Sequence, residues 1–284
     1  MPASTTLVTS RANVHVKQLR AAFAGNARLS GGLVAIEGEN LLHEALRSGL
    51  PLKTIFLSEH TAPPVWLPRG VELLHLAEEV FQSAVDTQHP QGIAALLVPP
   101  IWNIESMFPK DAAAAPLVLI AAALQDPGNL GTLIRSAEAF GATAVLTTLG
   151  TVGEWNQKAL RASAGSVFRV PVAQIAHADI GDLKSRGLRV FAAVAPGTKS
   201  IPVADADLTQ PCALMIGNEG AGLTPELLQI ADALITIPMP GHVESLNAAV
   251  AGSLLLYEAS RQREASRPRE AAGRSTASQL ITGN

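Results

Sequence analysis

An α/β fold with two sheets is predicted by three features of the sequence. Apolar segments of strand length alternate with segments of helical periodicity through most of the 284 residues. Hydrophobic residues make up 48% of the chain and aromatic residues only 4%, so the cores are expected to consist of Ala, Leu, Val and Ile. The alternation breaks at residues 101–115 and restarts at Pro116, which predicts a smaller N-terminal and a larger C-terminal domain.

The N-terminal unit, residues 1–105, has the pattern of a small α/β domain. A helix after Ser10 places Val16, Leu19 and Phe23 on one face. Gly49 is a stop signal for a second helix. Strands are expected at residues 33–38, 53–58, 71–76 and 91–98, and helices at 38–49 and 77–85.

The C-terminal unit, residues 106–263, contains continuous apolar strands between helices, which predicts a parallel sheet covered on both faces. Strands are expected at residues 116–124, 142–149, 167–173, 188–194, 212–217 and 233–239, and helices at 129–140, 224–231 and 244–263. Residues 264–284 are charged, small and rich in Ser and Ala, which predicts a disordered tail.

The net charge of −3 and the isoelectric point near 6.2 count against a nucleic-acid-binding protein, which is often basic. The charge is uneven, however. Residues 1–36 contain no Asp or Glu, and their cations are Arg11, Lys17, Arg20 and Arg28. This segment is therefore either a local basic patch or a solvated, flexible end.

Cys212 is the only cysteine, so the chain forms no internal disulfide and no thiolate zinc cluster. This usage predicts a cytoplasmic protein, and the N-terminus lacks the apolar core of a signal peptide. The longest apolar stretch, residues 112–124, is too short to span a bilayer, so no membrane association is expected. The seven histidines are scattered, and we expect no metal site.

Residues 124–142 form the first of three segments in which a strand ends in a turn that leads to a helix. Ligands bind at such strand ends in α/β sheets. Asn129 and Arg135 lie six residues apart near the start of the helix. An arginine here can hold a phosphate or stabilise developing negative charge. The alternative is an ion pair with a local carboxylate such as Glu138.

Residues 212–228 form the second segment, with Gly-Asn-Glu-Gly-Ala-Gly after an apolar strand. This loop matches neither the dinucleotide fingerprint nor the P-loop. Gly220 and Gly222 suit a positive φ or close contact with a ligand. Thr224 and the proline after it make a good helix start. A capped helix accounts for these two residues but leaves Glu219 unexplained.

Residues 234–263 form the third segment. Pro238 and Pro240 stiffen its turn and remove backbone donors. Ser245 and Asn247 lie near the start of the following helix, where either can act as its cap.

Together the three segments resemble the signature motifs of the SpoU (TrmH-like) family in the SPOUT superfamily of RNA methyltransferases. The first motif is matched by Asn129, Gly131, Arg135, Ser136, Phe140 and Gly141, the second by 216–223 and the third by 237–247. Residues 156–172, with Arg161, Ser163 and Gly165, resemble the intermediate segment of the family. Residues 10–20 and 32–46 resemble an RNA-substrate-binding domain similar in fold to small RNA-binding ribosomal proteins.

The resemblance implies a 2′-O-ribose methyltransferase that uses S-adenosyl-L-methionine on RNA, with rRNA favoured over tRNA. It also implies a trefoil knot in the catalytic domain and a homodimer joined through that domain. Arg135 inherits the central role, which we interpret as electrostatic because a guanidinium stays protonated in proteins. The other implied catalytic residues are Asn129, Glu219, Ser245 and Asn247. The implied cofactor-binding residues are Gly217, Asn218, Gly220, Ile237, Met239 and Leu246, and Arg161 is added to the RNA-binding cations.

Two other classes of protein compete with this one. A catalytically inactive RNA-binding paralogue with the same fold would be free to lose the catalytic side chains, yet Arg135, Glu219, Ser245 and Asn247 are all present. Gly-rich turns after strands also suggest a Rossmann dehydrogenase. The chain lacks that fold's fingerprint and the acidic residue at the end of its second strand.

Overall fold

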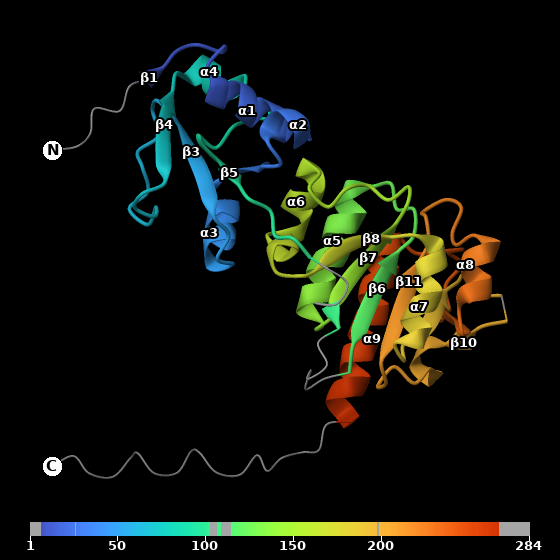
Figure 1. Cartoon of the computed structure of the whole chain (residues 1–284). Helices are drawn as coiled ribbons and strands as arrows, with labels where there is room; N and C mark the ends of the chain where they lie inside the picture. The colour runs from blue at the N-terminus through green and yellow to red at the C-terminus, as the bar shows by residue number, and fades with distance from the viewer. Residues whose placement is uncertain (1–6, 26, 103–106, 109–114, 198, 267–284) are drawn as a thin grey trace, which may run out of the picture.

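Two α/β domains make up the molecule, as the break in the sequence pattern predicts (Figure 1). The computed structural model describes residues 7–25, 27–102, 107–108, 115–197 and 199–266, without the side chains of residues 27 and 28. In Figure 1 the N-terminal domain runs from blue to cyan and the C-terminal domain from green to red.

The N-terminal domain contains a five-stranded mixed sheet in the order β1-β4-β3-β5-β2. Its elements are β1 (Leu7–Val8), α1 (Val14–Phe23), α2 (Ala27–Ser30), β2 (Val34–Glu37), α3 (Glu39–Arg47), β3 (Leu52–Ser58), β4 (Glu72–Leu76), α4 (Glu78–Gln82) and β5 (Ile93–Leu97). Strands β1, β4 and β3 are parallel, whereas β5 runs antiparallel to both β3 and β2.

Helices cover both faces of this sheet. Leu19 of α1 and Phe81 of α4 pack with Phe56 on one face. Leu42 of α3 packs on the other face, in a core that continues into the C-terminal domain through Phe168 and Val172. Because one apolar cluster spans both domains, α3 is a shared element of their packing.

The C-terminal domain contains a seven-stranded sheet in the order β10-β12-β9-β11-β6-β7-β8. Its elements are β6 (Leu117–Ala121), α5 (Pro127–Ala139), β7 (Ala144–Thr148), α6 (Gln157–Ser163), η2 (Ser166–Phe168), β8 (Val172–Ile175), η3 (His177–Asp179), α7 (Ile180–Ser185), β9 (Arg189–Ala193), β10 (Ile201–Pro202), η4 (Val203–Asp205), β11 (Cys212–Ile216), α8 (Pro225–Ile230), β12 (Ala233–Thr236) and α9 (Ala248–Ser266). Every pairing in it is parallel, so the strand carboxyl ends meet at one edge.

The predicted covering of both faces is confirmed. Helices α5 and α9 pack on one face, where Leu133 and Leu255 are fully buried. Helices α7 and α8 pack on the other face through Leu183 and Leu227. Figure 1 shows α7 and α8 in front of the sheet and α9 behind it.

Helix caps determine where the chain turns from strand to helix at the strand ends. Asp126 accepts a hydrogen bond of 2.9 Å from the backbone nitrogen of Asn129, and Pro127 occupies the first turn of α5. Thr224 caps α8 in the same way, as its sequence predicts. Asn247 caps α9, because its Oδ1 accepts from the backbone nitrogens of Ala249 and Val250.

The sequence predictions of the elements need correction in several places. Residues 167–171 are not a strand, because Gly165 at φ +85° leads into η2, and β8 begins only at Val172. Residues 244–247 precede α9, which begins at Ala248. Helices α6 and α7 were not predicted, because each is under eight residues and carries little periodicity.

Part of residues 101–115, where the sequence pattern breaks, is packed. Met107 is 1% exposed and belongs with partly buried Trp102 and Phe108 to the core beneath α7 and α8. Helix α9 continues to Ser266, so the first three residues of the expected disordered tail are helical. The rest of that tail, residues 267–284, lies outside the described residues. None of the helices in the described residues combines the length and the apolar character needed to cross a membrane.

Candidate active site

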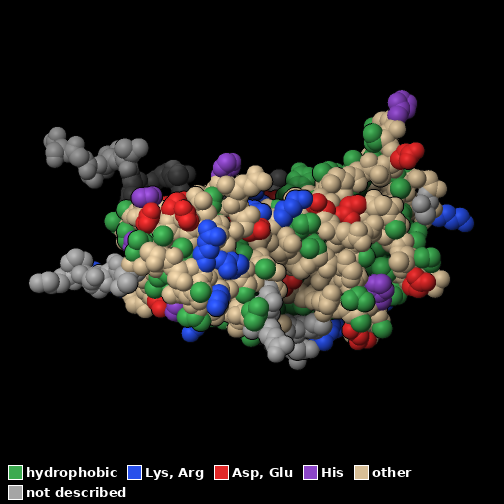
Figure 2. Space-filling view, turned by 90° about the horizontal axis from the view of Figure 1, so that it is seen from above, with side chains coloured by type: hydrophobic (Ala, Val, Ile, Leu, Met, Phe, Trp, Pro, Cys, Tyr) green, Lys and Arg blue, Asp and Glu red, His purple; other side chains and the backbone are tan. Residues whose placement is uncertain are grey.

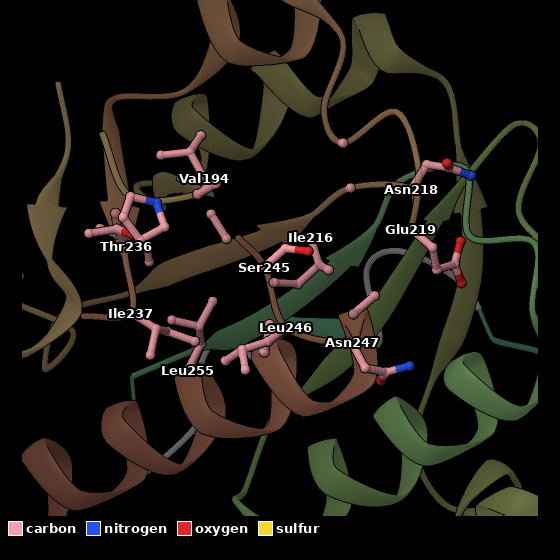
Figure 3. A pocket seen from close by; sticks show the side chains of 18 of the residues that line it. Val194, Ile216, Asn218, Glu219, Thr236, Ile237, Ser245, Leu246, Asn247 and Leu255 are labelled. Atoms are coloured by element: carbon pink, nitrogen blue, oxygen red, sulfur yellow. The ribbon is translucent and has the colours of Figure 1, made fainter. Parts of the chain in front are cut away.

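A cavity of about 490 Å³ opens at the carboxyl edge of the C-terminal sheet, where parallel α/β sheets bind ligands (Figure 3). The loops after β9, β11 and β12 and the start of α9 form its walls. Its lining comprises residues 193–196, 216–222, 235–237, Met239, 245–248, Ala251 and Leu255. Apolar walls with a few convergent polar groups are typical of a small-molecule site.

The structure brings the three predicted motifs together at one side of this cavity. Asn129 at the start of α5 donates from Nδ2 to Glu219 Oε1 over 2.9 Å. Asn247 before α9 donates from Nδ2 to Asn129 Oδ1 over 3.0 Å. Asn129 thus connects the second motif to the third. Asn247 uses its side-chain oxygen to cap α9 and its side-chain nitrogen to bind Asn129.

The loop that carries Glu219 is fixed by the residue before it. The side-chain oxygen of Asn218 accepts from the backbone nitrogens of Gly220 and Ala221, and its Nδ2 donates to Ala123 O over 2.9 Å. A Cβ at Gly217 would lie 2.3 Å from the backbone carbon of Gly222, so this turn requires glycine.

Gly222 has a φ of +68°, as its sequence context predicts. Gly220 does not have a positive φ, and it is an exposed residue of the cavity wall. Of the two roles that the sequence suggests for this glycine, close contact with a ligand is the one that remains.

Glu219 carries a negative charge at neutral pH. Partial burial raises the pKa of its carboxyl, but the hydrogen bond from Asn129 and several backbone amides outweigh that effect and lower the pKa below its ordinary value. Nearby, the Lys158 ammonium lies 2.8 Å from Asp126 Oδ2 and lowers the pKa of that carboxyl too, together with the amide of Asn129.

Arg135 stands on α5 two turns after the cap at Asp126, with its side chain exposed and outside the cavity lining. The proposed ion pair with Glu138 is not formed, because Glu138 is paired with Arg169. Within the described part of the chain, the side chain of Arg135 makes no hydrogen bond or ion pair. The guanidinium is therefore available to an external group such as a phosphate.

All six predicted cofactor-binding residues line the cavity, and so do Glu219, Ser245 and Asn247. Sequence reasoning missed residues 193–196, which comprise the last residue of β9 and the three after it, and Thr236 at the end of β12. The rule that ligands bind at strand ends would have indicated residues 193–196, because they follow a buried strand of the same sheet.

Thr236, one of the residues that line the cavity, carries a polar atom without a partner in the described part of the chain. Its Oγ1 is buried and has no hydrogen-bond partner among the described residues. A buried hydroxyl without a partner costs about 1–3 kcal/mol, so a ligand group that pairs with it gains that energy.

The predicted RNA-binding cations differ in their surroundings. Arg11 and Lys17 are exposed, and so is Arg161 on α6. Arg20 instead donates to the backbone oxygen and the hydroxyl of Ser83, which ties α1 to the residue after α4. Arg28 lies in α2, but its side chain is outside the described set.

Figure 2 shows Lys and Arg side chains gathered on the left of the upper face, the side on which Figure 1 draws the N-terminal domain. No cluster of three or more His, Cys, Asp and Glu side chains suited to a metal ion occurs in the described ranges.

Comparison with known protein families identifies the family of the domain that carries this site. The SpoU rRNA Methylase family matches residues 116–257, which are half of the chain. The chain belongs to this family. An MRM3-like substrate binding domain matches residues 13–95, so the family's catalytic domain and its substrate-binding domain coincide with the two observed sheets.

Individual relatives span nearly the whole chain. The 23S rRNA (guanosine(2553)-2′-O)-methyltransferase RlmP of Bacillus subtilis is 35% identical over 88% of this chain and 97% of its own length. The structure of an AdoMet-bound rRNA methyltransferase from Sinorhizobium meliloti superposes with a TM-score of 0.78 at 30% identity, covering 90% of this chain and 98% of the other. An RNA 2′-O ribose methyltransferase structure has a TM-score of 0.76 at 32% identity, covering 91% and 100%.

Proposed function

We propose that this protein transfers a methyl group from S-adenosylmethionine to a ribose 2′-oxygen of ribosomal RNA. The observation that carries the proposal is the junction of Asn129, Glu219 and Asn247 at the rim of a ligand-sized cavity. Side chains from three separated motifs meet there, and the two asparagines and the carboxylate provide donors and acceptors for a ribose.

The cavity suits S-adenosylmethionine. When bound, this cofactor supplies an electrophilic methyl group on a positively charged sulfur. Backbone groups at Gly217, Ile237 and Leu246 would hold it. A polar group of the cofactor would pair with the buried hydroxyl of Thr236, and apolar Leu255 closes the wall of the cavity. Asn218, Gly220 and Met239 complete the proposed cofactor-binding set.

The remaining chemical task is to activate a hydroxyl, which is a poor nucleophile while neutral. The ribose 2′-oxygen forms a bond to the methyl carbon as the bond between that carbon and sulfur breaks, the neutral thioether S-adenosylhomocysteine leaves, and the hydroxyl proton passes to solvent. We assign Arg135 to the electrostatic stabilisation of the negative charge that develops on the 2′-oxygen, since its guanidinium has no partner among the described side chains. The negative Glu219 and its partner Asn129 orient the ribose, and Ser245 and Asn247 stand beside them at the cavity.

RNA selection is assigned to the N-terminal domain, residues 1–105. Arg11, Lys17 and Arg28, with Arg161 of the catalytic domain, would contact phosphates, while Arg20 acts partly through Ser83. The relation to the B. subtilis enzyme favours large-subunit rRNA and makes the guanosine that corresponds to position 2553 the first nucleotide to examine.

The catalytic domain, residues 106–263, is proposed to form a homodimer and a trefoil knot around residues 215–255, with residues 264–284 as a separate tail. The dimer is supported by an apolar hollow of about 300 Å³ between α5 and α9. Val250, Leu254 and Tyr257 of α9 are 48%, 42% and 52% exposed there. A helix that is apolar on its outer face as well is expected to be covered by a partner. The single buried Cys212 supports a cytoplasmic location.

The test is methyl transfer by the purified chain with labelled S-adenosylmethionine. Unmodified 23S rRNA, ribosomal particles and tRNA serve as parallel acceptors, and the product is mapped as a 2′-O-methylated nucleotide by its resistance to alkali. We expect one modified ribose in rRNA and none in tRNA. A folded protein that binds the cofactor but modifies no acceptor would establish the inactive paralogue instead.

A further inference from the structure

One guanidinium joins the two domains. Arg169, between η2 and β8, donates from Nη1 to Glu44 Oε2 over 2.7 Å and to Ser48 Oγ over 3.0 Å, both at the carboxyl end of α3. Its Nη2 donates to Glu138 Oε2 on α5 over 3.0 Å, and its Nε donates to Glu138 Oε1. The same side chain therefore binds a helix of the substrate-binding domain and a helix of the catalytic domain.

The surrounding contact is closely packed. A Cβ at Gly165 would lie 2.6 Å from the Cβ of Glu44, so α3 and the residues before η2 approach as closely as glycine permits. Gln157 of α6 is buried and donates from Nε2 to Ala35 O of β2 over 2.9 Å. These contacts give Arg169 a fixed frame on both sides.

The position of Glu138 on α5 gives this contact a second consequence. Glu138 stands three residues after Arg135, a spacing at which opposite charges on a helix pair. The bidentate contact with Arg169 occupies both carboxylate oxygens of Glu138. Arg135 is thereby left without a partner among the described residues.

We propose that Arg169 is a positioning residue with two linked effects, which rest on the methyl transfer proposed above. It fixes the substrate-binding domain against α5, and it withholds Glu138 from Arg135 so that this guanidinium stays free for RNA. Loss of Arg169 would loosen the domain contact and release Glu138 to capture Arg135.

The two effects are separated by substitutions measured on the full-length chain. Arg169→Ala is expected to lower kcat about tenfold or more, because the released Glu138 then pairs with Arg135 and this guanidinium no longer stabilises the developing charge. It is also expected to raise KM for RNA, because the substrate-binding domain is no longer fixed against α5. Adding Glu138→Gln removes the competing carboxylate, so Arg169→Ala/Glu138→Gln should recover most of kcat and keep the raised KM. Glu44→Ala removes the carboxylate that Arg169 contacts on α3 and leaves the contact with Glu138 in place, so it should raise KM with kcat unchanged.

Controls make the result decisive. Arg47→Ala removes an exposed ion pair to the same Glu44 without touching the catalytic domain, and it should leave kcat and KM unchanged. Cofactor affinity by calorimetry and the circular-dichroism spectrum should be unchanged in all variants. A double variant as slow as Arg169→Ala, or Arg169→Ala with wild-type kinetics, would overturn the proposal. Absence of transfer by the wild-type chain would instead count against the proposed function.

Discussion

Asn129 donates a hydrogen bond of 2.9 Å to Glu219, ninety residues further along the chain. The contact joins the start of α5 to the loop after β11, and Asn247 extends it to the start of α9 over 3.0 Å. Asn129, the middle residue, thus donates to the carboxylate of Glu219 and accepts from the side-chain amide of Asn247. A network of this kind orients its members only while every bond is made.

Asn129→Ala is expected to lower the rate of methyl transfer about tenfold to a hundredfold, because Glu219 and Asn247 both lose their partner. Asn129 is not among the residues that line the cavity, so cofactor affinity by calorimetry should remain close to that of the wild type. Single-turnover rates at saturating cofactor check this. Unchanged turnover would show that the chain of contacts is structural only.

Arg135→Ala is expected to reduce transfer on the order of a hundredfold to a thousandfold, as the loss of a group that stabilises an oxyanion does. The side chain is exposed and has no partner in the described chain, so thermal stability should hardly change. Arg135→Lys keeps the charge but loses the planar fork, and an intermediate rate is expected. Turnover of Arg135→Ala near that of the wild type would remove Arg135 from its assigned role.

The strand ends, the three motifs and the part of the cavity wall that these motifs form were predictable because each is local in sequence. Motif residues follow a buried strand within a few positions, and parallel strands bring their carboxyl ends to one edge. The partners of Arg20 and Arg169 were not predictable. Ser83 lies 63 residues from Arg20, and Glu44 lies 125 residues from Arg169, so only the tertiary packing selects them.

Short helices were not predicted for a related reason. Helix α6 has seven residues, and its place is set by α5, where a Cβ at Gly131 would lie 2.3 Å from the backbone oxygen of Ala159. Such a close approach contributes no periodicity to the sequence. Gly131 is recognisable as a motif residue, but the pattern does not indicate the helix that packs against it.

Tyr257→Glu in α9 is expected to convert the proposed dimer to a monomer at micromolar concentration, because it places a charge in the apolar hollow beside Phe140. Light scattering after size exclusion measures the mass. Val65→Glu is the matched control, since Val65 is fully exposed in the N-terminal domain. A wild-type chain that is already monomeric would refute the dimer.

Arg11→Glu combined with Lys17→Glu is expected to weaken RNA binding and to lower the slope of log K against log salt by about one for each phosphate that is no longer bound. Arg20 is left intact because its contact with Ser83 would confound the result. This test is cleaner than removal of residues 1–105, which would expose the core that both domains share. Binding by filter retention over a salt series checks it. An unchanged slope would mean that Arg11 and Lys17 contact no phosphate of the RNA.

Arg263 holds the end of α9 to the residues that precede the amino ends of β6 and β11. Its guanidinium donates to the backbone oxygens of Leu208, Gln210 and Pro116 over 2.9, 2.9 and 3.0 Å, and also to that of Ala115. Helix α9 begins at the proposed active site and ends at this contact, so Arg263 anchors the helix whose first residues line the cavity.

Arg263→Ala is therefore expected to destabilise the fold by about 3 kcal/mol, since the hydrogen bonds from a charged group disappear and partly buried carbonyls are left unpaired. Urea unfolding followed by circular dichroism measures the change. Arg261→Ala, two residues earlier, removes only an exposed pair with Glu258 and should have little effect. Equal stability of the two variants would show that the backbone contacts of Arg263 do not anchor α9.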